Sequence, residues 1–131
     1  MATIKSYTDI EQSKKLAKIL SPKSADMFYI AGKGEPIFIG NKMVAYGEDD
    51  YDCLGGPDVL CWSLSALLSV LPNTIGCYYK TLGWFDNDWH CIYMDEDGET
   101  IGDDMGADNP VDACYKTIIG LSELKIKNYG I

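Results

Sequence analysis

Long apolar runs, paired cysteine spacings and histidines are all scarce in this 131-residue chain. The longest apolar stretch is bounded by Pro57 and Pro72 and interrupted by serines. It falls short of the roughly 18 apolar residues that a membrane-spanning helix requires, so we expect no membrane span. The first residues contain no apolar run resembling a signal peptide, and the five cysteines include no Cys-x-x-Cys spacing. We therefore expect a cytoplasmic protein with free thiols.

Motifs for phosphate and metal binding are also missing. Gly32-Lys-Gly34 and Gly55-Gly56 have the form of turns and lack the spacing of a phosphate-binding loop. Asp95-Glu-Asp-Gly98 superficially resembles a calcium loop, but the EF-hand register would place Tyr93 and Asp104 where the motif needs an aspartate and a glutamate. The single histidine and the cysteines lack paired zinc spacing. We expect neither a metal nor a cofactor.

The net charge of the chain also limits its possible functions. The formal net charge is −9 and the isoelectric point is near 4.4. Such acidity argues against direct binding of nucleic-acid phosphates and favours either plain solubility or a basic partner. The length suits one domain spanning residues 1–131.

The segment from Pro57 to Pro72 is the most apolar of the chain and predicts a central, largely buried helix. Leucines recur along it at helical spacing. Together with two residues of a later helix, four of them are expected to form the centre of the core: Leu64, Leu67, Leu68, Leu71, Ile118 and Leu121.

Two further helices are expected, one near each end of the chain. Thr8-Asp-Ile-Glu11 has the form of a capping box and predicts a helix from about Asp9 to Leu20. Asn109-Pro110 supplies an N-cap followed by proline, and predicts a helix from there to about Lys125. An apolar stripe through Val111, Cys114 and Ile118 supports it.

Strands are expected in the remaining segments. Residues 27–31, 36–39 and 42–46 predict two or three strands, the last two joined by a hairpin at Gly40-Asn41. Residues 75–82, 89–94 and 99–101 predict a meander whose second loop ends in Asp97-Gly98. The element order predicts an α+β fold: a single two-layer domain with about three helices packed on an antiparallel sheet of four to six strands.

Three segments resemble a family of short uncharacterised proteins from gut Bacteroidales and their phages. These are Tyr7–Leu16 with Ser24–Met27, Cys61–Leu68 and Ala107–Tyr115. The resemblance implies a small cytoplasmic or phage-encoded domain and transfers no activity.

One enzymatic hypothesis begins at Cys61. Cys61-Trp-Ser-Leu-Ser-Ala66 is similar to the helix start that carries the nucleophile in papain-like cysteine peptidases. The similarity implies that His90 would act as base and that Asp103 or Asp104 would orient its ring. The competing interpretation, which we favour, is that Cys61 is a small core residue and His90 an ordinary strand residue.

The preferred hypothesis is an accessory or regulatory protein that binds another macromolecule, most simply a protein. Aromatic side chains crowd the predicted meander, and such residues often anchor interfaces. Strand alternation places Trp89, Cys91 and Tyr93 on one face and His90 on the other. The candidate binding residues are Tyr78, Trp84, Trp89, Asp49 and Asp50.

A variant of this hypothesis is an acidic mimic of nucleic acid. It would require carboxylates at phosphate-like spacing on one face, for which a solvated acidic surface is the simpler interpretation. The residues concerned are Glu48, Asp49, Asp50, Asp52, Asp103, Asp104 and Asp108.

Overall fold

A computed structural model of the chain describes residues 5–39, 58–101 and 106–123. Within these ranges there are three α-helices and six strands. Their bounds are α1 (Ile10–Ala17), β1 (Met27–Tyr29), β2 (Ile37–Phe38), β3 (Val59–Cys61), α3 (Leu64–Val70), β4 (Thr74–Ile75), β5 (Tyr78–Phe85), β6 (Asp88–Met94) and α4 (Pro110–Glu123).

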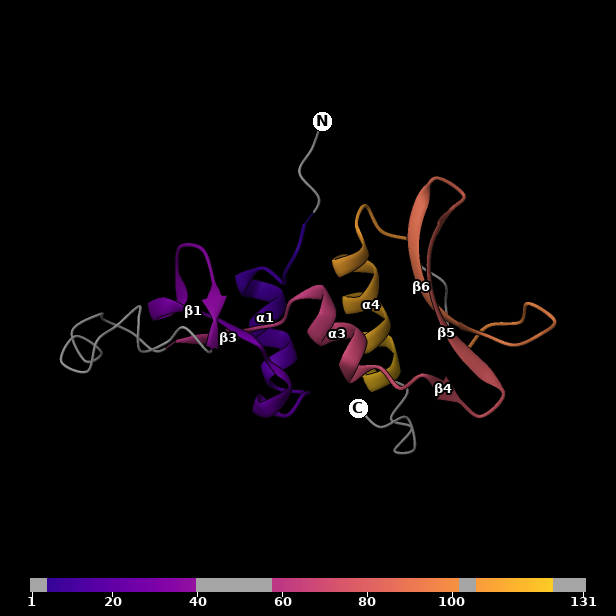
Figure 1. The fold of residues 1–131 in the computed structure, drawn as a ribbon, viewed down its shortest axis with the longest axis horizontal. Helices are drawn as coiled ribbons and strands as arrows, with labels where there is room; N and C mark the ends of the chain where they lie inside the picture. Colours follow the sequence, from indigo (N-terminus) through magenta and orange to yellow (C-terminus); the bar gives the residue numbers. More distant parts are fainter. Residues whose placement is uncertain (1–4, 40–57, 102–105, 124–131) are drawn as a thin grey trace.

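The strands form two three-stranded antiparallel sheets, in the orders β2-β1-β3 and β4-β5-β6. Figure 1 shows the three helices between the two sheets. The α+β class, the three helices and the expected number of strands are confirmed. The strands divide into two sheets where one was expected, and α1 packs on β3 of the first sheet whereas α4 packs on β6 of the second.

Helix α1 begins one residue later than its predicted capping box. Asp9 is the N-cap: its carboxylate accepts from the Gln12 N–H at 2.8 Å, and the Gln12 amide oxygen accepts from the Asp9 N–H at 3.1 Å. Both Thr8-x-x-Glu11 and Asp9-x-x-Gln12 fit the motif. Thr8 is fully buried, and its hydroxyl is hydrogen-bonded to that of Ser13. Asp9 therefore caps the helix instead.

The first sheet joins segments that are distant in the sequence. In it β1 pairs with β2 through Met27 and Phe38, and with β3 through Phe28 and Leu60. Ala31 follows β1 with a left-handed φ of 54°, and its N–H donates to the Asp58 carboxylate at 3.0 Å. The expected strand 42–46 and its hairpin at residues 40–41 lie outside the described residues.

The predicted central helix is wrong over its first part. Val59–Cys61 form strand β3, and α3 begins only at Leu64, with Ser63 as N-cap. The Asp26 carboxylate accepts from both the backbone N–H, at 2.9 Å, and the hydroxyl of Ser63, which fixes the turn between strand and helix. A continuous apolar run does not distinguish a buried strand from a buried helix, so periodicity could not locate this boundary.

The second sheet is a local meander. Strands β5 and β6 pair from Tyr79–Met94 to Phe85–Asp88, and the two-residue loop Asp86-Asn87 has φ angles of 53° and 65°. Two left-handed residues are the signature of a type I′ turn, whose twist matches that of a hairpin. The predicted turn at Asp95–Gly98 is confirmed, with φ 84° at Gly98. The expected strand 99–101 is reduced to one bridge, between Met94 and Thr100.

Helix α4 lies between α3 and β6 and completes the core. Asn109 caps it as expected, its side chain accepting from the Asp112 N–H at 2.8 Å. Val111, Cys114 and Ile118 are fully buried. Of the expected core residues, Leu67, Leu71, Ile118 and Leu121 are buried, whereas Leu64 and Leu68 are half-buried. None of the helices in the described ranges is long and apolar enough to cross a membrane.

Candidate functional site

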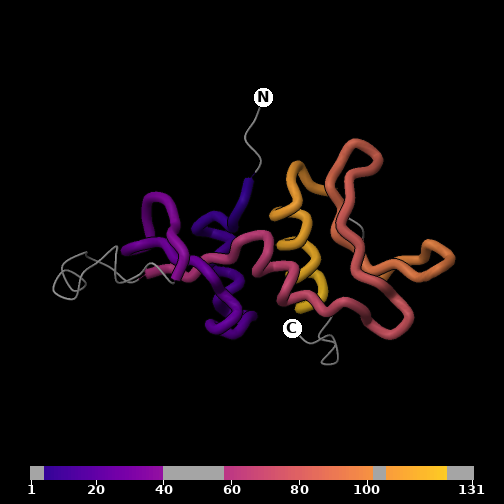
Figure 2. The backbone as a smooth tube through the Cα atoms, in the orientation of Figure 1, coloured from indigo at the N-terminus to yellow at the C-terminus, as the bar shows by residue number. Residues whose placement is uncertain are grey.

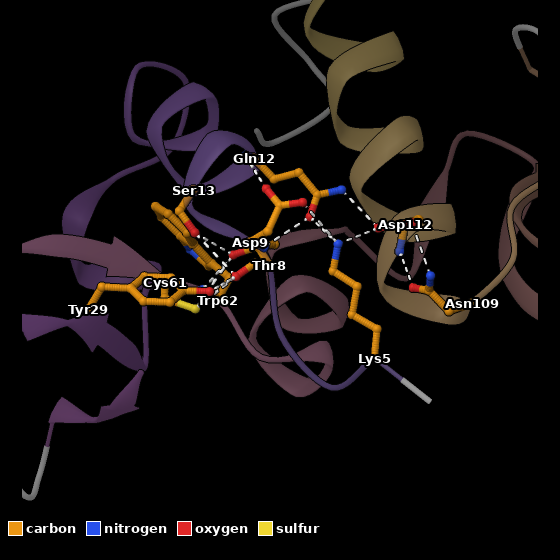
Figure 3. Close-up of polar contacts among 10 residues, drawn as sticks. All are labelled: Lys5, Thr8, Asp9, Gln12, Ser13, Tyr29, Cys61, Trp62, Asn109 and Asp112. Carbon is orange, nitrogen blue, oxygen red and sulfur yellow. Dashed lines mark hydrogen bonds and ion pairs between the residues drawn. The ribbon is translucent and has the colours of Figure 1, made fainter. Parts of the chain in front are cut away.

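Cys61 lies at the end of β3 inside a buried polar cluster (Figure 3). Its thiol donates to the Thr8 carbonyl at 3.3 Å, and the same carbonyl accepts from the Tyr29 hydroxyl at 2.7 Å. The Thr8 hydroxyl lies 2.8 Å from that of Ser13 and accepts from the Trp62 N–H at 3.2 Å. The cluster joins the start of α1 to both β1 and β3.

The electrostatics of this cluster do not suit a nucleophile. Burial raises the pKa of the Cys61 thiol, and it outweighs the hydrogen bonds from Thr8, Ser13 and Tyr29 that favour the thiolate. Burial also raises the pKa of Tyr29 far above its ordinary value. An active cysteine needs a lowered pKa and solvent access. Cys61 has neither, and it precedes α3 by three residues where the hypothesis placed it at the helix start.

His90 occupies the other sheet. Its ring stacks on that of Phe85, with ring centroids 4.1 Å apart and planes 9° apart, and its Nε2 lies 3.1 Å from the Phe85 carbonyl oxygen. In Figure 2 the backbone of β3 and that of β6 lie on opposite sides of the helices. Asp103 and Asp104 lie outside the described residues. The structure therefore does not bring Cys61 and His90 together.

A second polar network ties α1 to α4 (Figure 3). The Lys5 ammonium donates to the Asp112 carboxylate at 2.9 Å and to the Gln12 amide oxygen at 2.7 Å. Burial of Asp112 opposes its ionisation, but hydrogen bonds from Gln12, Lys5 and Asn109 hold the pKa of its carboxyl below the ordinary value. Each of these polar groups has a hydrogen-bond partner within the network, as expected for a contact that holds two helices together.

Two more thiols are buried between β6 and α4. A hydrogen bond with the Cys91 thiol, and then burial, raise the pKa of Cys114. The Thr117 hydroxyl donates to the Cys91 carbonyl. Both cysteines belong to the core shared by the three helices and the second sheet.

An open hollow of about 640 Å³ lies beside α3. Its most polar group is Lys80, whose ammonium donates to the carbonyls of Leu68, at 2.6 Å, and Leu71, at 3.0 Å. These carbonyls belong to the C-terminal end of α3, where a cation is stabilising. Lys80 therefore serves as a helix cap. The other lining residues are Leu64, Ser65, Leu68, Ser69 and Asn73.

The exposed aromatic residues are the remaining candidates: Phe38 on β2, and Tyr79 and Trp84 on β5. Trp84 is 57% exposed and Tyr79 is 51% exposed. Trp84 pairs with Trp89 across the hairpin, and their rings meet edge to face with centroids 5.9 Å apart and planes 68° apart. Tyr78 is half-buried and packs on the core. Asp49 and Asp50 lie outside the described residues.

Trp89 is held in place from both sides. Besides pairing with Trp84, it exchanges two backbone hydrogen bonds with Ala107, of 2.8 and 2.9 Å. It also packs against the core. Residues 84–89, here termed the hairpin tip, thus present an exposed tryptophan on a rigid support. Edge-to-face aromatic pairs add to this rigidity.

Sequence reasoning named Trp84 and Trp89 but missed how they meet. The signal was present, since a two-residue loop at Asp86-Asn87 places Trp84 directly opposite Trp89. It also missed Tyr79 as an exposed residue and Phe85 as the partner of His90. No protein-family model, curated protein or solved structure matches this chain.

Proposed function

We propose that this protein is a small accessory or regulatory protein that binds another protein through the hairpin tip. The observation that carries the proposal is the exposure of Trp84, which is 57% exposed while its ring packs on Trp89. Tryptophan is strongly enriched among the residues that dominate binding energy at interfaces. An exposed tryptophan in a fixed position favours binding because little conformational entropy is lost when a partner docks.

The competing enzymatic hypothesis lacks a reactive group. Cys61 is buried with a raised pKa, and it lies in a different sheet from His90. A net charge of −9 also argues against phosphate contacts with nucleic acid. The resemblance to small proteins of gut bacteria and their phages fits a phage-encoded regulator acting on a cytoplasmic protein.

The proposal is tested by comparing Trp84→Ala with Tyr79→Ala. Both residues are aromatic, lie on β5 and are exposed to a similar extent, but only Trp84 belongs to the hairpin tip. Each variant would be coupled to resin, and the proteins captured from the native host would be quantified by mass spectrometry. Recovery of the true partner should fall about tenfold or more for Trp84→Ala, as for an interface hot spot, and stay near wild type for Tyr79→Ala.

Thermal melts of both variants serve as the folding control. A captured protein whose recovery is equally affected by the two substitutions, or by neither, would show that the hairpin tip is not the binding surface.

A further inference from the structure

We infer that the partner presents a basic segment, with a lysine or arginine side chain lying against the exposed ring of Trp84. This inference rests on the proposed function and adds the chemistry of the partner to it. It is carried by the charge around the hairpin tip together with the exposure of the ring.

The second sheet and its turns are strongly acidic. Residues 74–101 contain six carboxylates and one lysine. That lysine, Lys80, already donates to the carbonyls at the end of α3. The carboxylates are Asp86, Asp88, Asp95, Glu96, Asp97 and Glu99.

Among the described residues, none of these carboxylates makes an ion pair. Both ion pairs found among the described residues are made by Lys5, with Asp9 and with Asp112. By contrast, residues 5–39 contain six lysines against four carboxylates. Within the described part of the chain, negative charge is therefore concentrated on the turns of the sheet that carries the exposed tryptophan. A positively charged partner would be attracted to this sheet and oriented by it.

The hairpin tip combines both groups that bind a cationic side chain. An ammonium or guanidinium group over a tryptophan face is attracted by the ring quadrupole, and tryptophan is the best of the aromatic residues for this contact. Asp86 lies in the turn two residues after Trp84, whereas Asp88 pairs with Phe85, so its side chain lies on the other face of the hairpin from Trp84. A lysine or arginine at the ring would thus lie close to the turn that carries Asp86, whose carboxylate makes no ion pair in the described part of the chain.

The test uses short peptides of alternating glycine and arginine or glycine and lysine, with a glycine–glutamate peptide as control. The chain has three tryptophans, so the indole N–H signals of Trp62, Trp84 and Trp89 can be followed by NMR. Basic peptides should shift the signals of Trp84 and Trp89 and leave that of Trp62, which is buried and donates to Ser24. The acidic peptide should shift none of them.

Two charge-neutralising variants separate a local site from general attraction. Asp86→Asn/Asp88→Asn removes two charges at the hairpin tip, and Glu96→Gln/Asp97→Asn removes two charges at the other turn of the same sheet. We expect the first pair to weaken binding of the arginine peptide roughly fivefold and the second less than about twofold. Equal weakening by the two pairs would overturn the inference, because it would mean diffuse attraction to an acidic protein.

The two proposals can fail separately. If capture of the partner depends on Trp84 but basic peptides leave the Trp84 and Trp89 signals unchanged, the partner is not basic and the proposed function stands. If capture is insensitive to Trp84→Ala, the hairpin tip is not a binding surface and both proposals are wrong.

Discussion

The two sheets are both three-stranded and antiparallel, yet they use their residues in opposite ways. Sheet β2-β1-β3 has strands of two or three residues, and all three residues of β1 are buried. Around it, buried polar groups bond to one another. Sheet β4-β5-β6 has strands of up to eight residues and carries exposed aromatic rings and carboxylates. The first sheet is thus mostly internal, with Phe38 on β2 as its exposed aromatic residue, whereas β5 of the second sheet exposes both Tyr79 and Trp84.

The contrast is clearest in two tryptophans. Trp62 is fully buried, and its indole donates to the Ser24 hydroxyl at 2.9 Å. Trp84 is mostly exposed on the hairpin tip. The same type of side chain is thus part of the core at one end of the molecule and mostly exposed at the other.

The largest difference is expected in thiol reactivity. Cys61 is fully buried in β3 of the first sheet, and Cys77 is exposed between β4 and β5. Since Cys61 can react only when the structure opens, iodoacetamide should label it about a thousandfold or more slowly than Cys77. Peptide mapping of timed samples at pH 6 measures both rates, and the two should converge in denaturant. Rapid labelling of folded Cys61 at this pH would revive the cysteine-hydrolase hypothesis.

The second-largest difference is expected in the loss of stability when each of the two tryptophans is replaced by alanine. Trp62→Ala leaves a cavity in the core and should lower the free energy of unfolding by about 3–5 kcal/mol. Trp84→Ala removes a ring that is mostly exposed, so its effect should stay below about 1 kcal/mol. Urea denaturation of both variants measures the difference. Losses of similar size would mean that the second sheet depends on Trp84 for its stability.

Two threonines provide an isosteric comparison. Thr8→Val removes the hydroxyl that bonds Ser13 and Trp62, leaving buried polar groups unsatisfied, and should cost about 1–3 kcal/mol. The Thr81 hydroxyl donates to the Tyr79 carbonyl in an exposed position, so Thr81→Val should change stability by less than about 0.5 kcal/mol. The melting temperatures of the two variants measure the difference. A larger decrease for Thr81→Val than for Thr8→Val would contradict the structural role of the buried polar groups at the first sheet.

The smallest effect concerns acid stability. The pKa of Asp112 is lowered in the folded chain, so its ionised form stabilises the fold above the ordinary pKa of 3.8. This contribution is lost as the pH falls through the folded value. Wild type should therefore lose more stability than Asp112→Asn between roughly pH 5 and pH 3, by about 1 kcal/mol or less. The free energy of unfolding of each protein would be measured by denaturation at several pH values. The same pH dependence for the two proteins over this range would contradict the prediction.

Local signals predicted much of the second half of the chain, although the strand expected over residues 75–82 is divided into β4 and β5. Asn109-Pro110 located the start of α4, and Asp95–Gly98 gave a turn, because each requires only neighbouring residues. The first sheet was harder to predict, since it joins Met27, Phe38 and Cys61 across long stretches of chain. No local pattern shows that Val59–Cys61 pairs with β1 before the helix begins.

The candidate site was predicted in part. Composition identified Trp84 and Trp89, but exposure depends on where α4 stops covering the sheet, which the sequence does not show. Burial of Thr8 and Ser13 was also invisible, because these residues are ordinary at a helix start and become internal only when β3 packs on α1.

Helix α3 also couples the unfolding of the two sheets. It has seven residues, too few for an isolated helix to be stable, so it depends on what holds its ends. Its start is fixed by Asp26, beside the first sheet, and its end by Lys80, from the second. Each sheet thus secures one end of the same helix, and we expect both to unfold as one cooperative unit. Hydrogen exchange should show matching opening free energies for amides of β1 and β5, and Lys80→Met should separate them.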